Sequence, residues 1–358
     1  MNILLVTIAN SDIGFGHLNR CLSIASIVAD KNVVVEFTIF GDDSVSSIMD
    51  KTCYKYSLSS SSDLLNVTNI ETTVINNHFD VALIDLIHPS FFYRRDNTDE
   101  IFRKISEYAH IVVVIDSLGE QSLAVQLPNA TIDILVVPYA LDESSLSRIN
   151  GVGIRQIHGT DYALLSSAYL SAPLRVAREN ANRILVTCGG SDPTEMSLIV
   201  LEGLELLESQ IEIHVVIGPL FKNILKAKIE VFRASSLHKI TLVVDADNLA
   251  GHMLWCDIAI SASGLTKYEL AATGTPAIVV SVDTKHELDN RPFAALGTAI
   301  DMGVSPPSSK IAEKTFKLLN NLLLRESMMQ TGLKLFDGKG ALRLMAEIMK
   351  ELKCKRKT

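Results

Sequence analysis

The chain has 358 residues, of which 47% are hydrophobic and 21% are charged, and its formal net charge is −8. Because this length is too great for one ordinary core and the apolar content can fill two, these numbers exclude a disordered chain and predict two domains. The acidic balance, without a basic stripe carrying interleaved aromatic residues, argues against nucleic acid as a partner.

The cysteines and the N-terminus indicate the compartment. Five cysteines are scattered without a CxxC pair or a cluster with metal-ligand spacing, which is typical of reduced thiols in the cytosol. Residues 2–8 have the pattern of a β-strand rather than of a signal peptide. No apolar run approaches the roughly 20 residues that span a bilayer. We therefore expect a cytoplasmic protein with no integral membrane segment and no metal site.

Short β-branched apolar runs alternate with stretches of helical periodicity along most of the chain. The first half contains five predicted strands, at residues 3–8, 33–40, 81–85, 111–116 and 134–137. The second half contains five more, at residues 183–188, 211–217, 240–244, 257–261 and 277–282. Strands alternating with helices predict βαβ units and parallel sheets, which is the α/β class.

The rhythm is broken between residues 138 and 171 by Gly151, Gly153 and Gly159, and we place the domain boundary there. The prediction is one doubly wound, Rossmann-like domain at residues 1–165 and a second at 166–358, facing a central cleft. The last helix, near residues 340–352, is expected to pack back on the first domain. Ligands of such sheets bind at the carboxyl ends of the strands, so the glycine-rich turns that follow strands are the candidate sites.

The first such turn contains Gly14, Gly16, His17 and Arg20, directly after the first strand. Glycine lets the backbone turn tightly and approach a ligand, and the start of a helix offers unpaired N–H groups. An imidazole at a helix N-terminus tends to stay neutral and can act as a general base. The alternative is that His17 only caps or packs. The third glycine of a dinucleotide-binding fingerprint is missing.

The second turn lies at the matching place in the second half, where Gly189 and Gly190 precede Asp192 and Pro193. The two glycines suggest a close approach of the backbone to a ligand or to the opposite domain. Asp192 has two interpretations that we leave open, a helix N-cap and a substrate contact.

The third turn is the richest in polar groups. Ser263, Gly264 and Thr266 at a helix start form a set of N–H and hydroxyl donors suited to a diphosphate. Glu269, one turn further on, can accept hydrogen bonds from a diol such as a ribose, or it can pair with a neighbour on a solvated face. Lys267 is expected to be solvated.

A weaker candidate is a loop at residues 286–290, which ends with Asn290 and follows the predicted last strand. It could close over a ligand, although His286 could equally be an exposed loop residue. Four other titratable residues near strand ends or in the linker receive no role: Asp85, His88, Asp116 and His158. The chain has no Gly-x-Ser-x-Gly elbow.

Residues 13–22, Ile-Gly-Phe-Gly-His-Leu-Asn-Arg-Cys-Leu, resemble the signature of the UDP-sugar hydrolases of the pseudaminic acid pathway, the UDP-2,4-diacetamido-2,4,6-trideoxy-altropyranose hydrolases. Relatives of that family include spore-coat polysaccharide proteins and, more distantly, the inverting GlcNAc transferase that forms lipid II. Further similar segments follow in the family's order, at residues 161–165, 189–193, 263–276 and 337–341. The resemblance therefore covers nearly the whole chain.

The resemblance implies a GT-B fold that binds UDP mainly through residues 166–358 and needs neither metal nor cofactor. It implies that His17 activates a water molecule for attack on the anomeric carbon of the sugar. Glu269 would bind the ribose, and Ser263, Gly264 and Thr266 would hold the phosphates. Helix N-termini can stabilise the departing UDP without a divalent ion.

Two departures from the family pattern lie in the sugar-binding half. The hydrolases carry Arg-x-Asp before the glycine turn, where this chain has Val6 and Ile8, and Asp-x-Tyr later, where it has Asp85 and Ile87. Two enzymes therefore remain open: a UDP-sugar hydrolase, and an inverting glycosyltransferase that passes the sugar to an acceptor sugar. A third, non-enzymatic possibility is a nucleotide-sugar sensor.

Overall fold

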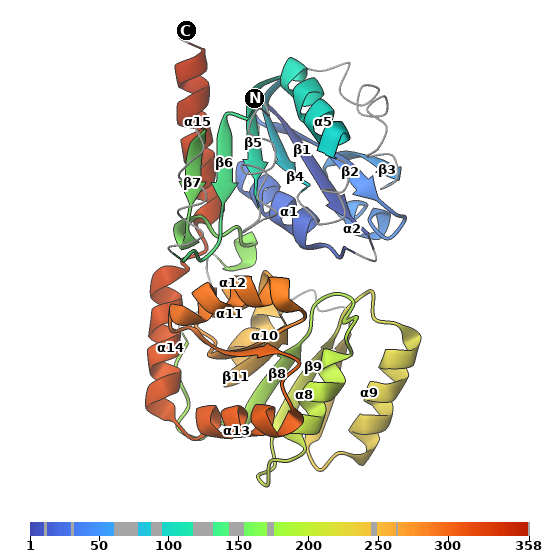
Figure 1. Ribbon diagram of the computed structural model, residues 1–358, viewed down its shortest axis with the longest axis vertical. Coiled ribbons are helices and arrows are strands. Elements are labelled where there is room, and N and C mark those ends of the chain that lie inside the picture. The colour runs from blue at the N-terminus through green and yellow to red at the C-terminus, as the bar shows by residue number, and fades with distance from the viewer. Residues whose placement is uncertain are drawn as a thin grey trace. The chain divides into compact units, whose positions relative to one another are not determined.

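The computed structural model describes residues 1–10, 13–29, 32–60, 78–86, 95–116, 132–142, 154–169, 175–244, 249–262 and 264–356 (Figure 1). The chain divides into two compact units. The first unit joins Met1–Ser167 to Lys339–Thr358, and the second is Ala168–Gly338. The first unit thus contains the last helix of the chain.

The first unit is built on a parallel sheet with the strand order β3-β2-β1-β4-β5-β6-β7. Its strands are β1 (Asn2–Ala9), β2 (Val34–Gly41), β3 (Lys55–Ser60), β4 (Phe79–Asp85), β5 (Ala109–Ile115), β6 (Ile134–Val137) and β7 (Arg155–His158). The five strands predicted here are confirmed. The two edge strands, β3 and β7, were not predicted, because an edge strand buries few side chains and so lacks an apolar run.

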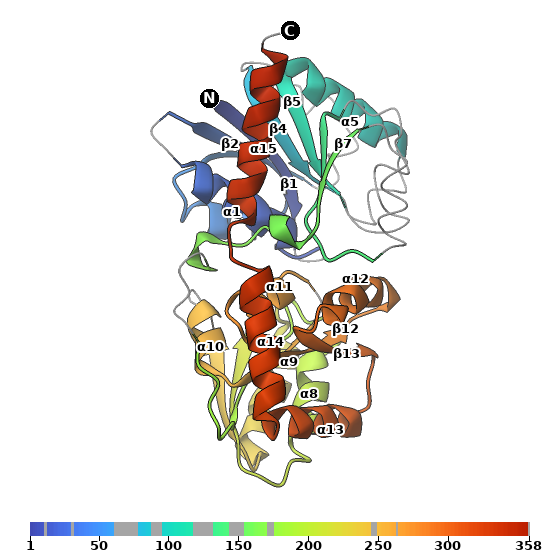
Figure 2. The same ribbon diagram turned by 90° about the vertical axis from the view of Figure 1, so that its left-hand side faces the viewer.

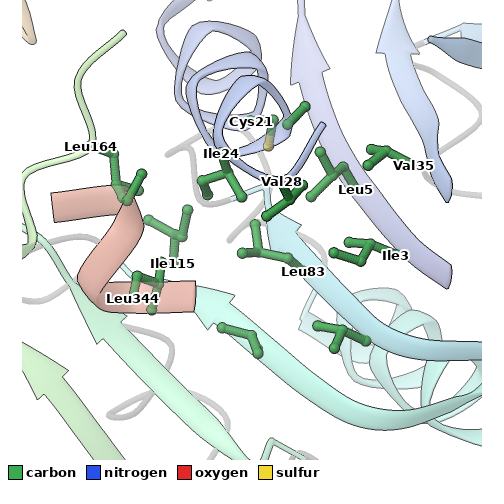
Figure 3. Packing of buried hydrophobic residues seen from close by; sticks show 14 of the residues in the cluster. Ile3, Leu5, Cys21, Ile24, Val28, Val35, Leu83, Ile115, Leu164 and Leu344 are labelled. Atoms are coloured by element: carbon green, nitrogen blue, oxygen red, sulfur yellow. The ribbon is translucent and has the colours of Figure 1, made fainter. Parts of the chain in front are cut away.

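Alternate side chains of each central strand serve the two faces of this sheet. Ile3 and Leu5 of β1 pack in one cluster with α1 (Gly16–Val28) and α15 (Gly340–Lys355), which lie on the same face (Figures 2 and 3). Val6 and Ile8 pack on the other face, in the cluster that includes side chains of α5 (Arg95–Tyr108). The two residues at the first departure from the family pattern, Val6 and Ile8, are therefore core residues. Among the described residues, this unit also contains the helix α2 (Ser46–Met49) and the 3-10 helix η3 (Thr160–Tyr162).

The second unit is built on a parallel sheet with the order β10-β9-β8-β11-β12-β13. Its strands are β8 (Arg183–Thr187), β9 (Glu212–Ile217), β10 (Lys239–Val244), β11 (Ile258–Ala262), β12 (Ala277–Ser281) and β13 (Ala299–Val304). The five predicted strands are confirmed, but the expectation that residues 277–282 form the last strand is wrong. The edge strand β13 follows, and it buries only Ala299 and Met302.

Helices surround the second sheet. They are α8 (Met196–Leu204), α9 (Asn223–Ser235), α10 (Leu249–Trp255), α11 (Thr266–Ala272), α12 (Thr284–Ala295), α13 (Ser308–Leu319) and α14 (Leu322–Leu335). The helices α11 and α14 pack closely, because Gly332 has no side chain to keep α14 away from the backbone of Ala271. The first residues of this unit are Ala168 and Tyr169, which belong to the 3-10 helix η4 (Ser167–Tyr169).

Both sheets reverse their strand order at one point, between β1 and β4 in the first unit and between β8 and β11 in the second. Helix connections leave a doubly wound sheet in opposite directions at such a point, and ligands bind there at the carboxyl ends of the strands. The turns after β1, β8 and β11 are three of the candidate sites. In the described parts of the chain, no helix combines the length and the apolar character needed to cross a membrane.

Candidate functional site

The turn that presents His17 is built by Asn10 and Gly14. The Ile13 N–H donates to Asn10 Oδ1 and the Gly14 N–H to the Asn10 carbonyl, both at 2.8 Å. Gly14 has φ +81°, a left-handed conformation in which residues other than glycine are strained. The chain then enters α1 at Gly16, so His17 lies in the first turn of this helix, as the sequence predicts.

The side chain of His17 contacts Asp85, a residue to which the sequence analysis gave no role. Asp85 is the last residue of β4, which pairs with β1, and its side chain is buried. His17 Nδ1 lies 2.7 Å from Asp85 Oδ1. Arg20, one turn further along α1, donates from Nε to Asp85 Oδ2 at 2.7 Å and from Nη2 to Oδ1 at 2.8 Å. The three side chains form one polar cluster, in which Asp85 and Arg20 are buried and His17 is partly buried.

Charge balance decides the protonation of this cluster. Burial opposes ionisation of Asp85, but Arg20 and His17 beside it outweigh burial and hold the pKa of its carboxyl at about 2. Burial would lower the pKa of Arg20, but Asp85 outweighs it and raises that pKa above its ordinary value. Asp85 is therefore an anion and Arg20 a cation at neutral pH.

The ionised carboxylate selects the tautomer of His17. An unprotonated Nδ1 only 2.7 Å from Asp85 Oδ1 would set two lone pairs against each other, so the proton belongs on Nδ1. Arg20 Nη2 also lies 2.8 Å from His17 Nδ1. Because Nη2 donates to Asp85 Oδ1, it does not need Nδ1 as an acceptor. In the neutral ring, Nε2 is then the unprotonated atom, as a general base requires.

Arg20 was expected in a substrate loop; in the structure it belongs to this cluster, and a substrate contact stays a prediction. The residue is 7% exposed, and its guanidinium contacts Asp85, His17 and the face of the Tyr139 ring, 6.0 Å from the centroid. Predicting the contact with Asp85 would have required the order of the strands in the sheet, which the periodicity of the sequence does not reveal. Two signals were available: Asp85 ends a strand on the edge where ligands bind, and it stands where the hydrolases carry the Asp of Asp-x-Tyr.

The glycine turns of the second unit share the geometry of the first. Gly189 has φ +80° and Gly264 has φ +122°, and at both a side chain would project into open space. Gly16 and Gly190 are equally open. These turns therefore leave room beside the backbone at the carboxyl ends of β1, β8 and β11.

Asp192 makes the contacts of a helix cap. Its Oδ1 accepts from the Met196 N–H at 2.7 Å and its Oδ2 from the Ser197 N–H at 2.9 Å, at the start of α8. The residue is 3% exposed, and burial raises the pKa of its carboxyl although these N–H groups oppose the shift. Both oxygens are thus directed toward the helix. A role in substrate binding stays a prediction.

Thr266 begins α11 beside Gly264, and Ser263 lies outside the described residues. Glu269 lies one turn further on and is partly buried. Its carboxyl hydrogen-bonds the Tyr169 side chain, and burial raises its pKa to about 7. Burial, followed by the nearby Glu269, raises the pKa of Tyr169 as well. Tyr169 is a further residue of this site that sequence analysis missed, since it lies 100 positions before its partner.

Lys267 is buried, so the expectation that it is solvated was wrong. It is 3% exposed, because α11 lies between neighbouring elements and buries most of its surface. The ammonium donates to Asn290 Oδ1 at 2.9 Å, and Asn290 Nδ2 donates to Ser281 Oγ at 2.9 Å. Asn290 was expected in a substrate loop. Its amide is fully buried and turned toward these two side chains, which leaves a ligand contact a prediction.

The segment that contains His286 is the start of α12, not a loop. Asp283 caps this helix by accepting from the His286 N–H at 2.9 Å, and His286 Nδ1 lies 2.8 Å from the same oxygen. Asp116 is buried immediately after β5, and His158 is exposed at the end of β7. His88 and Ile87 lie outside the described residues. Within the described ranges, no three His, Cys, Asp or Glu side chains are arranged to hold a metal ion.

Sequence comparison adds a domain match and two relatives. Residues 183–341 match the glycosyltransferase family 28 C-terminal domain. An uncharacterized protein of Methanocaldococcus jannaschii is 26% identical over 296 residues, which are 78% of this chain and 55% of that protein. The spore coat polysaccharide biosynthesis protein SpsG of Bacillus subtilis is 27% identical over 208 residues, which are 56% of this chain and 60% of SpsG. The aligned part of this chain thus spans little more than half of each relative.

Solved structures share the whole fold. MurG of Acinetobacter baumannii has a TM-score of 0.66 at 14% identity, covering 98% of this chain and all of MurG. MnaA of S. aureus, solved as a co-structure with UDP, has a TM-score of 0.67 at 12% identity, covering 98% of this chain and 97% of MnaA. We conclude that the chain has the predicted GT-B fold of two Rossmann-like domains, and that its residues 183–341 are similar to the C-terminal domain of glycosyltransferase family 28.

Proposed function

We propose that this protein is a metal-independent enzyme that hydrolyses a UDP-sugar to UDP and a free aminodeoxy sugar, for nonulosonic acid or surface glycan biosynthesis. The observation that carries the proposal is the 2.7 Å contact between His17 Nδ1 and the buried Asp85 carboxylate. It supplies an oriented imidazole with an unprotonated Nε2 at the point where the first sheet reverses its strand order.

The second unit is proposed to bind the nucleotide. Support comes from the match to the family 28 C-terminal domain and from the fold shared with MnaA, which was solved with UDP. Glu269 would accept hydrogen bonds from the ribose hydroxyls. Ser263, Gly264 and Thr266 would hold the diphosphate at the start of α11. Backbone N–H groups at a helix start stabilise a departing phosphate without a metal ion.

In the proposed reaction, His17 Nε2 takes a proton from a water molecule while the water oxygen attacks the anomeric carbon. The bond from that carbon to the phosphate oxygen breaks, and its electron pair leaves with UDP. The imidazolium that forms is stabilised by Asp85 through the bond at Nδ1, as in other His–carboxylate pairs. It later returns its proton to solvent. The products are UDP and the free sugar.

An inverting glycosyltransferase is the second candidate, and the family 28 match favours it. Burial of Val6 and Ile8, where the hydrolases carry Arg and Asp, also points away from the hydrolase pattern. The chemistry would differ in one reactant only. His17 would take the proton of an acceptor sugar hydroxyl, which would then attack the anomeric carbon in place of water.

An NMR time course separates the two enzymes. The purified protein is incubated with UDP-2,4-diacetamido-2,4,6-trideoxyhexose and, separately, with UDP-GlcNAc, and no acceptor is added. Release of free sugar and UDP at about 1 s⁻¹ or faster supports the hydrolase. His17→Ala should abolish the release, and His78→Ala, which changes an exposed histidine, should not. Donors that bind but stay intact favour the transferase.

A further inference from the structure

Two histidines of the second unit contact each other and have no part in the function proposed above. His214 Nδ1 of β9 lies 3.1 Å from His252 Nδ1 of α10, although 38 positions separate the two residues. Both side chains are partly buried. At this distance one Nδ1 carries a proton and the other accepts it with its lone pair. The fold thus brings two imidazole nitrogens together at one point.

The spacing of these two nitrogen atoms matches that of two ligands of one metal ion. With metal–nitrogen bonds of about 2.0–2.1 Å, two imidazole nitrogens lie about 3.3 Å apart in tetrahedral geometry and about 2.9 Å apart at the right angle of square-planar geometry. The observed 3.1 Å lies between these values. Binding of an ion therefore requires rotation of the two rings but little movement of β9 or α10.

Aromatic contacts hold the ring of His214 in place. It stacks on the ring of Trp255, with the centroids 3.5 Å apart and the planes 2° apart, and the ring of His252 meets it edge-on at 5.1 Å between centroids. Trp255 is the last residue of α10, the helix that also contains His252. The two nitrogen ligands are thus positioned before an ion arrives, which reduces the entropy lost on binding.

Burial and the surrounding charges keep His214 neutral at pH 7. Burial, followed by the nearby His252, lowers the pKa of His214. Lys239 and Arg183 also lower it, and Glu212 opposes them. A neutral imidazole is the form that binds a metal ion. Glu212 accepts from Lys239 Nζ at 2.9 Å, so water rather than this carboxylate would complete the coordination of an ion.

We propose that His214 Nδ1 and His252 Nδ1 bind one divalent transition-metal ion of the kind that imidazole favours, Ni²⁺, Cu²⁺ or Zn²⁺. The ion takes the place of the proton between the two nitrogens. The ring that donates from Nδ1 in the metal-free protein then carries its proton on Nε2, and no electron is transferred. Two protein ligands, rather than the three or four of a structural zinc site, and the nearby cations Lys239 and Arg183 predict micromolar rather than tighter affinity.

The position of the pair gives the ion a structural role, separate from the reaction. The charged neighbours of His214, which are Arg183, Glu212 and Lys239, are the first residues of β8, β9 and β10. The pair therefore lies toward the amino ends of these strands, whereas the glycine turns follow carboxyl ends. An ion at this place connects α10 to β9. It stabilises the folded second unit, because it binds tightly only when both ligands are in place.

Fluorescence of Trp255 tests the site, because this residue is the single tryptophan of the chain and stacks on one of the two ligands. Paramagnetic Ni²⁺ quenches a nearby tryptophan, so titration of the full chain without a histidine tag should give quenching that saturates at micromolar Ni²⁺ and that excess Zn²⁺ reverses. His252→Gln should weaken Ni²⁺ binding about tenfold or more, because one of two ligands is lost. His78→Gln, which changes an exposed histidine of the first unit, should leave it within twofold. Quenching that does not saturate, or that is equal in His252→Gln, would overturn the site.

Nitrogen-15 NMR of the histidine rings identifies the ligands in the wild-type protein and decides the question even if His252→Gln fails to fold. Excess Zn²⁺ should shift the Nδ1 signals of both His214 and His252 and leave both Nε2 atoms protonated. The thermal midpoint of the wild type should rise by about 3 °C or more, and that of His252→Gln by less than about 1 °C. Coordination through other histidines, or through only one of these two, would overturn the proposal. An equal rise in both proteins would indicate an adventitious ion only and would also overturn it.

Discussion

Asp85 determines what His17 can do. A histidine near the start of a helix can cap, pack or act as a base, and its sequence does not distinguish these roles. The contact of 2.7 Å between Nδ1 and an anionic carboxylate favours one tautomer and leaves Nε2 as the basic atom. Arg20 keeps the carboxylate charged despite its burial. The role of each residue thus depends on the other two.

Replacing Asp85 with asparagine should therefore affect catalysis more than nucleotide binding. We expect kcat to fall about 10³-fold or more, because the amide no longer favours the Nδ1–H tautomer or stabilises the imidazolium. UDP affinity should stay within threefold of the wild type. The same substitution breaks the ion pair between Asp85 and buried Arg20, so it should lower the free energy of unfolding by about 3 kcal/mol.

Turnover assays, titration calorimetry and denaturation give these three values, with the exposed Asp43→Asn as the control. Nitrogen-15 NMR of the wild-type protein tests the tautomer directly. A His17 ring that carries its proton on Nε2 at neutral pH would contradict this account of the base.

Glu269 predicts a pH dependence of UDP binding. Burial raises the pKa of its carboxyl to about 7, so at pH 6 most molecules carry the protonated form, which is a poorer acceptor for ribose hydroxyls. UDP affinity should therefore rise by up to about tenfold from pH 6 to pH 8, as the ionised fraction rises. Titration calorimetry should show a smaller rise in Glu269→Gln, which isolates the ionisation of UDP itself. Equal slopes in both proteins would remove the ribose assignment.

The raised pKa of Glu269 has the opposite effect on the stability of the fold, which falls as the pH rises. The unfolded chain releases the proton of Glu269 near its ordinary pKa of about 4.3, whereas the folded chain holds it up to about 7. The contribution of this group to stability is therefore full below the unfolded pKa and is lost as the pH rises through the folded value. The pH that favours UDP binding is thus one at which Glu269 destabilises the fold.

At the scale of elements, each candidate turn joins the end of a strand to the start of a helix. Glycine with positive φ allows the turn after β1, β8 and β11, and a polar side chain organises the first and second of these turns. In the second turn this side chain is Asp192, whose two oxygens accept N–H groups from the start of α8. Local chemistry of this kind is visible in the sequence, because caps act over a few residues.

Removing the cap should affect stability and not affinity. Asp192→Ala should lower the free energy of unfolding by about 1 kcal/mol, since two N–H groups lose their acceptor, and Asp192→Ser should recover part of it. The exposed Glu208→Ala should be neutral. Chemical denaturation gives these values, and binding of UDP-GlcNAc should stay within twofold. A tenfold loss of affinity in a folded Asp192→Ala protein would show that the carboxylate also contacts the substrate.

At the scale of the molecule, the core of the first unit includes α15, which lies near the other end of the chain from β1. Leu344 of α15 packs beside Ile115 and Leu164 in the core of this unit (Figure 3). Arg155 of β7 pairs with Glu347 of α15 at 2.6 Å. A side chain at Gly340 would collide with the backbone of Tyr162 and Ala163, so glycine allows the start of α15 to pack against η3.

Gly340→Val should therefore destabilise the first unit by about 2–4 kcal/mol, because α15 must move away from its place in the core. Leu342→Val, which changes an exposed side chain of the same helix, should change stability by less than 1 kcal/mol. Chemical denaturation followed by hydrogen exchange would assign the loss to a unit. A loss confined to the second unit would contradict the role given to this helix.

The amino-acid sequence by itself determined the α/β class, ten of the strands and the turns that contain Gly14, Gly189 and Gly264. These features follow from periodicity and from local backbone chemistry, which act over a few residues. Three of the four edge strands, β3, β7 and β13, lack an apolar run and became visible only through pairing with their neighbours, whereas the edge strand β10 was predicted. Strand order is likewise set by packing of the whole sheet.

Contacts between distant residues were decided by the tertiary structure alone. Asp85 lies 68 positions from His17, Tyr169 lies 100 positions before Glu269, and Asn290 lies 23 positions after Lys267. Composition and spacing do not show which of many carboxylates or amides a side chain will contact. The tautomer of His17 and the burial of Lys267 follow from those contacts, which exist only once the chain has folded.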